Sequence, residues 1–177
     1  MLRAVLLVAF VLVDIYATVA QQPEPLVTLR RTSCYGRCPV YSVEIYADGF
    51  IRYVGINFVQ YTGEHRAVVP QEVVGNLVAY ILKADYFALR DSYETYKDRK
   101  GRTWIITDLP TVVTSLRVGT AKKTVRDYAF APRRLCELED EIDRVANTKR
   151  WIGNPLLNAP MPTPQAPLPT TLTPPTS

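Results

Sequence analysis

Apolar and polar residues alternate through the first half of the chain, which is the pattern of β-strands buried on one face. In residues 26–32, the alternation places Val27 and Leu29 on the same side. Because successive strand residues point to opposite faces, these two side chains are expected to face the core. The expected strands of this half are residues 26–32, 40–46, a third strand that starts at 51 and continues through 56–60, and 64–69, with a turn at 61–63.

The second and third strands are expected to form a hairpin whose register depends on its turn, Ala47-Asp48-Gly49. A two-residue loop would place Arg52 opposite Ile45 and would mix polar and apolar side chains on one face. A three-residue loop with Gly49 in the left-handed region separates one apolar face from one wet face. This register pairs Ile45 with Ile51, Val43 with Tyr53 and Glu44 with Arg52.

Two segments have helical periodicity instead. A helix over 70–84 is expected to begin at Pro70, because the first helical position needs no N–H group. Gly75 weakens this helix by up to about 1 kcal/mol. A second helix is expected over 132–148. The apolar stripes are Val73, Val74, Leu77, Val78, Ile81 and Leu82 in the first helix, and Leu135, Leu138, Ile142 and Val145 in the second.

The region between the helices predicts a loop followed by a second hairpin. Residues 90–103 are rich in charge and tyrosine and lack a clear period, so we expect a long, solvated and partly mobile surface loop. Residues 112–118 are rich in β-branched side chains, and 123–128 return after a turn at 119–122. Three residues after the first helix are expected to close over the core: Tyr86, Phe87 and Leu89.

These elements together predict an α+β fold. The expected architecture is an antiparallel sheet of about six strands, with chain order β-β-β-β-α-β-β-α and both helices on one face of the sheet. The apolar side of each strand then packs against the apolar stripes of the helices.

The two ends of the chain differ from the region between them. Residues 1–20 have the pattern of a secretory signal peptide, in which Arg3 precedes an apolar run too short to span a bilayer. Cleavage is expected near Ala20, which makes the mature protein secreted or periplasmic, with no transmembrane span. The expected organisation is a signal peptide over 1–20, a linker over 21–25, an α+β domain over 26–152 and a disordered Pro/Thr-rich tail over 153–177.

Composition narrows the classes of function. The formal net charge is +4 and the pI is about 9.0. This mild basicity favours a partner with an anionic surface, for which we expect an envelope protein or an envelope polymer. No motif or run of basic residues indicates nucleic-acid binding. His65 is the single histidine, which is few for proton-transfer catalysis, and the usual hydrolase and phosphate-binding motifs are missing. We therefore expect no catalytic residues and no cofactor.

The three cysteines carry the most distinctive chemistry. In an extended strand Cys34 and Cys38 would lie about 13 Å apart, whereas a disulfide requires Cα atoms within about 7 Å. If the two are bonded, the chain folds back between them, and Gly36 is the residue that could take a positive φ to allow it. Pro39 suits the first residue of the following strand. Cys136 lies on the flank of the second helical stripe, where we expect a semi-buried free thiol, with pairing to either other cysteine left open.

The chain resembles a known family through several short motifs. The segment Cys34-x-Gly36-x-Cys38-Pro39-x-Tyr41 is followed by Asp48-Gly49, Tyr53-x-Gly55, Asp108-x-Pro110 and Pro132-x-x-Leu135. This pattern resembles the bacterial domain of unknown function 6438 over residues 27–152. The resemblance implies a mostly secreted family without an established activity. Asp108 is expected to bond the nearby backbone and set the turn before Pro110.

Two functional hypotheses follow. The first is an exported, non-catalytic envelope domain with a structural Cys34–Cys38 disulfide, and exposed tyrosines within 90–103 are compatible with a binding module. The alternative is a thiol redox or Cu(I) site built on Cys34, Cys38 and His65, because Cys-x-x-x-Cys-Pro is also the spacing of copper-delivery proteins with a thioredoxin-like fold. In those proteins the motif leads into a helix. Here it leads into a strand, which favours the structural disulfide.

Overall fold

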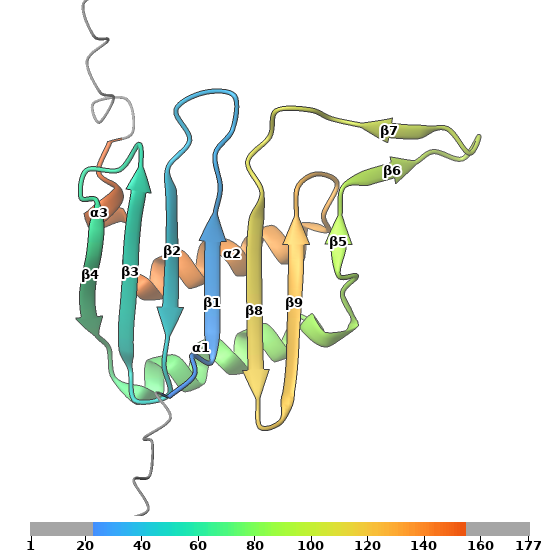
Figure 1. Cartoon of the computed structure of the whole chain (residues 1–177). Coiled ribbons are helices and arrows are strands. Elements are labelled where there is room, and N and C mark those ends of the chain that lie inside the picture. The colour runs from blue at the N-terminus through green and yellow to red at the C-terminus, as the bar shows by residue number, and fades with distance from the viewer. Residues whose placement is uncertain (1–22, 155–177) are drawn as a thin grey trace, which may run out of the picture.

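The computed structural model describes residues 23–154, which contain a seven-stranded sheet with helices on one face (Figure 1). The expected signal peptide and all of the tail beyond residue 154 lie outside the described residues. Along the sheet, the strands follow the order β4-β3-β2-β1-β8-β9-β5. Their bounds are β1 (Val27–Arg31), β2 (Val40–Ile45), β3 (Phe50–Asn57), β4 (Gly63–Val68), β5 (Ser92–Tyr93), β8 (Val112–Val118) and β9 (Ala121–Asp127).

The expected α+β class is confirmed, and the sheet is larger than expected. Strands β1 to β4, β8 and β9 pair antiparallel with one another. The additional strand, β5, is only two residues long and pairs parallel with β9. This strand lies in the segment that was expected to be a loop. It joins the sheet because the Tyr93 side chain is buried in the core.

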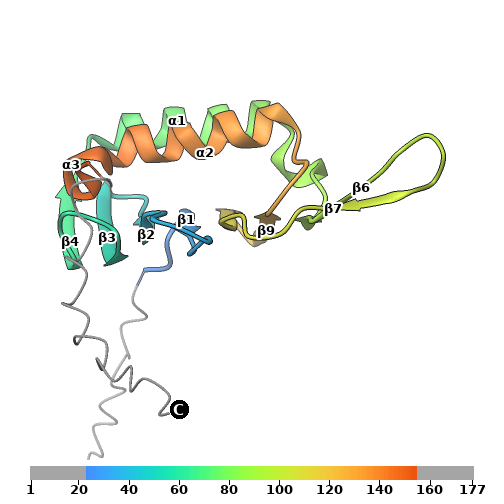
Figure 2. The ribbon, with the colours of Figure 1, turned by 90° about the horizontal axis from the view of Figure 1, so that it is seen from above.

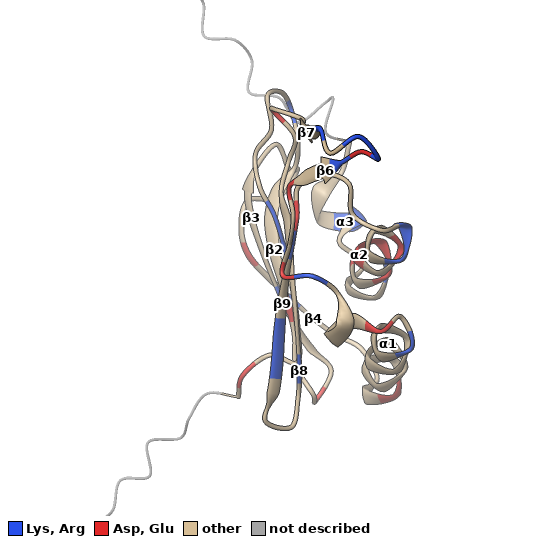
Figure 3. Ribbon diagram, turned by 90° about the vertical axis from the view of Figure 1, so that its right-hand side faces the viewer, with Lys and Arg blue, Asp and Glu red and all other residues tan. Residues whose placement is uncertain are grey.

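The helices α1 (Gln71–Lys83) and α2 (Arg133–Ala146) lie side by side on one face of the sheet, and the other face is open (Figures 2 and 3). A 3₁₀ turn, η1 (Tyr86–Ala88), follows α1, and a short helix, α3 (Lys149–Ile152), follows α2. None of the helices within residues 23–154 combines the length and apolar character needed to cross a bilayer. The buried stripe residues are Val74, Leu77 and Ile81 of α1, and Leu135, Leu138, Ile142 and Val145 of α2.

Two expectations about the helices are corrected. The second helix ends at Ala146 and not at residue 148, because Asn147 adopts the left-handed conformation (φ 51°), which closes a helix at its carboxyl end. Of the residues expected to close over the core, Tyr86 and Leu89 are buried, whereas Phe87 is exposed. The 3₁₀ turn leaves Phe87 exposed while Tyr86 and Leu89 are buried.

The expected hairpin register is confirmed. Ile45 pairs with Ile51, Val43 with Tyr53 and Glu44 with Arg52. Gly49 has a φ of 89°, and Phe50 donates its backbone N–H to the Asp48 carboxylate at 3.0 Å. The three-residue turn therefore separates a buried apolar face from a wet face. On the wet face, Arg52 bridges Glu44 at 3.1 Å and Glu64 at 2.8 Å.

Strand β3 ends earlier than expected because the chain folds over Gly55. It stops at Asn57, and Phe58 takes a positive φ of 51° that turns the chain towards β4. A Cβ atom on Gly55 would lie 2.2 Å from the Tyr61 carbonyl oxygen. Only glycine leaves room for this approach of residues 58–62, of which 58–60 were expected to extend the strand and 61–62 to form the turn.

Residues 94–106 form a projecting β-hairpin, where a long loop without strands was expected over 90–103. The strands β6 (Thr95–Lys97) and β7 (Thr103–Ile105) pair with each other and are separate from the main sheet. We call this hairpin the arm. It extends well beyond the sheet on the side of β9 and β5 (Figures 1 and 2).

Substitution of Gly75 by alanine should stabilise the protein. Gly75 is exposed in the middle of α1, and a Cβ atom there would meet no neighbour within 4 Å. We expect Gly75→Ala to raise the free energy of unfolding by up to about 1 kcal/mol, measured by urea denaturation. Gly55→Ala is the matched control and should destabilise by about 2 kcal/mol or more, because its methyl group would overlap backbone. Equal effects of the two variants would contradict this account.

Candidate functional site

The disulfide confirms that the chain folds back between Cys34 and Cys38. The two sulfur atoms are bonded and the Cα atoms are 5.8 Å apart. Gly36 donates its N–H to the Cys34 carbonyl at 2.9 Å, which makes a tight turn around Tyr35. The turn leaves the Tyr35 side chain 90% exposed. The disulfide thus closes a small loop that presents an aromatic ring to solvent.

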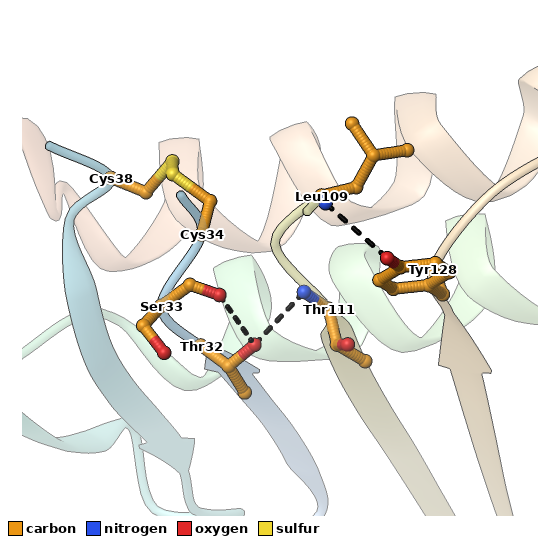
Figure 4. Close-up of a disulfide and its surroundings, with 7 residues drawn as sticks. All are labelled: Thr32, Ser33, Cys34, Cys38, Leu109, Thr111 and Tyr128. Atoms are coloured by element: carbon orange, nitrogen blue, oxygen red, sulfur yellow. Dashed lines mark hydrogen bonds between the residues drawn. A yellow bond between two sulfur atoms is a disulfide. The ribbon is translucent and has the colours of Figure 1, made fainter. Parts of the chain in front are cut away.

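A second loop, residues 106–110, lies against the disulfide loop. The Asp108 carbonyl accepts a hydrogen bond from the Tyr35 N–H at 3.2 Å. Just below, Thr32 donates its N–H to the Thr111 carbonyl, and its hydroxyl accepts the Thr111 N–H at 2.9 Å (Figure 4). Leu109 also donates its N–H to the Tyr128 hydroxyl at 3.4 Å. These bonds connect the loops that leave β1 and enter β8.

Asp108 acts differently from what the sequence led us to expect. Its side chain makes no hydrogen bond to the described residues, and its backbone carbonyl makes the contact instead. The residue has a positive φ of 68°, a conformation that aspartate tolerates better than most residues. The turn before Pro110 is therefore set by the backbone conformation of Asp108.

The arm has an ordered tip. The Asp98 carboxylate accepts the N–H groups of Lys100 and Arg102 at 2.9 and 3.0 Å, and the Arg102 guanidinium at 2.7 Å. The Trp104 indole N–H also points to it at 3.4 Å. Gly101 takes a φ of 78° to complete the turn. One carboxylate therefore holds the tip in a single conformation.

Exposed apolar side chains gather at this end of the sheet. We call the rim the disulfide loop (34–38), the arm, residues 107–110 and Phe130. Within residues 23–154, seven of the fourteen strongly exposed large apolar side chains belong to it. The Phe130 ring lies 5.7 Å from Tyr96, which connects the base of the arm to the main domain. The seven are Tyr35, Tyr96, Trp104, Ile105, Ile106, Leu109 and Phe130.

The rim also carries positive charge. Arg102 is paired with Asp98 and lies 5.5 Å from the Trp104 ring. Arg37, Lys97, Arg99 and Lys100 make no ion pair with any of the described residues. Exposed aromatic rings beside unpaired cations are typical of a binding surface.

The structure distributes the motif residues over several places. Gly36, Asp108 and Pro110 lie at the rim with the disulfide, and Pro39 directly follows the disulfide loop. Asp48 and Gly49 form the turn at the opposite end of β2 (Figure 1). Gly55 lies under residues 58–62, and Tyr41 is buried beneath α2. The motif therefore describes turns and packing across the fold and not one cluster of reactive groups.

The alternative Cu(I) site is not supported. Both sulfur atoms of the proposed ligands are bonded to each other. His65 lies on β4, where its ring stacks on Trp151 at 6.2 Å and its Nε2 contacts the Thr62 carbonyl at 3.1 Å. No group of three His, Cys, Asp or Glu residues suited to a metal occurs in the described part of the chain. Cys136 is a free thiol, and it is exposed where we expected it to be semi-buried.

A partly buried polar network joins α2 to the sheet. The Asp143 carboxylate accepts the Tyr41 hydroxyl at 2.8 Å, the Arg31 guanidinium at 2.8 Å and the Thr148 hydroxyl at 2.9 Å. Burial alone would lower the pKa of Arg31, but the facing Tyr41 and Asp143 raise it. Burial, with the Asp143 charge beside it, raises the pKa of the Tyr41 hydroxyl. Arg31 and Tyr41 therefore stay protonated at neutral pH, and both continue to donate hydrogen bonds to the Asp143 carboxylate.

Glu139 lies one helical turn before Asp143 and lacks such partners. Its side chain is buried, and its Oε1 makes no hydrogen bond to the described residues. Burial, together with the nearby Asp127 carboxylate, raises the pKa of Glu139 to about 8. The side chain is therefore mostly protonated at neutral pH, which removes the cost of burying a charge.

Two surface hollows lie near the other end of the sheet. Both are lined by Pro23, Tyr46 and Asp48, one also by Arg117 and the other by the ion-paired Arg52 and Glu64. Neither brings a nucleophile next to a base. The rim is therefore the strongest candidate for the functional surface.

Sequence reasoning missed the arm and the buried network. For the arm, a usable signal was present: Thr95-Tyr96-Lys97 and Thr103-Trp104-Ile105 flank a turn with Asp98 and Gly101. The three-residue strands were too short to stand out from the surrounding charge. For the network, Arg31 and Asp143 are 112 positions apart, and no local pattern connects them.

The raised pKa of Glu139 predicts a pH-dependent stability. Between pH 4.5 and about 8 the unfolded chain ionises Glu139 and the folded chain does not, so stability falls as pH rises through this range. Glu139→Gln should abolish this fall. At pH 8 the variant should be more stable than wild type by a few kcal/mol, because each pKa unit corresponds to about 1.4 kcal/mol. Urea denaturation at a series of pH values measures the free energy of unfolding. The exposed Glu137→Gln is the control, and identical pH profiles for both variants would contradict the assignment.

Comparison with known proteins assigns the chain to a family. No curated protein matches the chain. Residues 25–146 match the family described as Domain of unknown function (DUF6438). The match covers β1 to α2, and so includes both layers of the domain and the whole rim. The chain therefore belongs to the family of the domain of unknown function DUF6438.

Proposed function

We propose that this protein is an exported, non-catalytic envelope domain that binds a partner through its rim. The observation that carries the proposal is the concentration of exposed aromatic and aliphatic side chains on the rim, beside four cations that form no ion pair within residues 23–154. A disulfide and an ordered hairpin hold these side chains in place. A surface organised before binding loses less conformational entropy when a partner docks.

The cysteines support export. A disulfide between Cys34 and Cys38 persists in an oxidising compartment and is uncommon in the cytosol. The pattern of residues 1–20 has the features of a secretory signal peptide. These two independent features favour a secreted or periplasmic location, with residues 26–152 as the folded domain and the Pro/Thr-rich tail as an extension.

The titratable groups support a binding role over a catalytic one. The single histidine, His65, is engaged in aromatic stacking on β4. Asp143 is saturated with donors, and the neighbouring Glu139 is buried away from solvent. None of these groups faces the rim, where the exposed surface lies.

The disulfide should be present in the exported protein and should contribute to its stability. We expect thiol titration of the denatured, unreduced protein to find one thiol per chain, that of Cys136. The double variant Cys34→Ser/Cys38→Ser should lose about 2 kcal/mol of unfolding free energy in the chain-entropy model, as measured by urea denaturation. Cys136→Ser is the control and should have little effect. Three titratable thiols would exclude the disulfide and the structural role given to it.

Site-specific photo-cross-linking tests the binding role. A photoreactive phenylalanine analogue replaces Tyr35 or Tyr96 at the rim, and the exposed Tyr80 of α1 serves as the control position. After irradiation of cells that export the protein, we expect adducts from the rim positions and few from Tyr80. Adducts that are equally abundant at all three positions, or missing from the rim, would overturn the proposal.

A further inference from the structure

We propose that the arm docks onto an anionic lipid bilayer, so that the partner of the rim is a membrane surface. This inference rests on the proposed function and specifies the chemistry of the partner. Three observations carry it: the arrangement of apolar side chains on the arm, the unpaired cations at its tip, and the projection of the arm from the domain.

One face of the arm is apolar and interfacial in character. Tyr96 pairs directly with Trp104 across the hairpin, so both side chains leave the same face. The Phe130 ring continues this face at 5.7 Å from Tyr96. Tyr96 and Trp104 are about half exposed, at 49% and 51%. Tryptophan and tyrosine are the residues that concentrate at the level of lipid head groups.

The tip of the arm carries cations that no acidic side chain of the described residues neutralises. Residues 97–102 contain four basic residues and one acidic residue, Asp98, which is engaged by Arg102. Lys97, Arg99 and Lys100 make no ion pair within residues 23–154. Figure 3 shows the charged tip at the end of the hairpin. Basic residues next to interfacial aromatic side chains attract the phosphate groups of anionic lipids.

The shape of the arm suits a flat and extended partner. The hairpin projects beyond both layers of the domain, so it can reach a planar surface without interference from α1 or α2 (Figure 2). Ile105, 69% exposed, leaves the opposite face of the hairpin from its neighbour Trp104, and Ile106 at the base of the arm is 41% exposed. The two hollows described above lie near the other end of the sheet and take no part in this surface. A bilayer requires no groove that receives a side chain.

Tryptophan fluorescence measures the docking directly. The chain has two tryptophans, and Trp151 is buried against Tyr53, with ring centroids 4.7 Å apart. A change in emission on addition of vesicles therefore reports Trp104. The protein is used as the cell processes it, with its disulfide intact. We expect a blue shift with vesicles of about one third phosphatidylglycerol in phosphatidylcholine, and none with phosphatidylcholine alone.

Sedimentation with the same vesicles quantifies the contribution of each group. Arg99→Gln/Lys100→Gln should weaken binding by about 30-fold, given the attraction expected for each basic residue near an anionic surface. Trp104→Ala should weaken it by about tenfold through loss of apolar contact. The matched control is Lys83→Gln/Lys122→Gln, which removes the same charge from exposed positions of α1 and β9 and should bind as wild type. All variants should retain the wild-type midpoint of thermal unfolding.

Two results would overturn the lipid assignment. The first is no blue shift and no sedimentation with the anionic vesicles. The second is an equal loss of binding in the arm and control double variants, which would show attraction by net charge alone. If vesicle binding fails while photo-cross-linking at Tyr35 and Tyr96 still captures a protein, the lipid proposal falls and the binding role of the rim stands. If both experiments fail, the proposed function falls as well.

Discussion

The pairing of β1 with β8 is the interaction on which both the fold and the rim depend. These strands are distant in the chain, and Val27 lies opposite Leu116 and Arg31 opposite Val112. The pairing joins the four-stranded N-terminal meander to the C-terminal hairpin and places β1 at the centre of a sheet with one buried face. At its upper end, the hydrogen bonds between Thr32 and Thr111 bring together the loop closed by the disulfide and the loop that leads back from the arm. If this pairing were lost, the rim would separate into unconnected loops.

The polar network under α2 depends on the same central strand. Arg31 is the last residue of β1, and its guanidinium meets Asp143 of α2 together with the Tyr41 hydroxyl of β2. Taking one partner from such a buried set leaves a charge without compensation, so the network restricts how α2 can lie on the sheet. Glu139 occupies the same layer and avoids the cost of a buried charge by holding its proton. The helical layer is thus positioned by a few polar contacts within a mainly apolar interface.

The rim and the polar network under α2 lie in different parts of the domain. Arg31, Tyr41 and Asp143 lie between the sheet and α2, where their polar contacts join the two layers. The exposed rings and free cations lie at the edge of the domain, on segments held by a disulfide and by the carboxylate of Asp98. Such a separation suits a rigid scaffold that presents a surface to a partner. An amphipathic hairpin on this scaffold has the chemistry to meet an anionic lipid surface, and the export proposed above would bring it into a compartment that membranes border.

Local patterns determined the parts of the structure that depend on neighbouring residues. The period-two alternation and the Gly49 turn specify the β2–β3 register, because a shift of one residue would expose Val43 and Ile45. The apolar spacing from Leu135 to Val145 likewise specifies which side of α2 is buried, and the four-residue spacing with Gly36 is compatible with a loop closed by Cys34 and Cys38. The tertiary structure alone decided the strand order, the Arg31–Asp143 pair and the placement of the arm. These depend on contacts between residues far apart in the chain, and such contacts leave no period or spacing in the sequence.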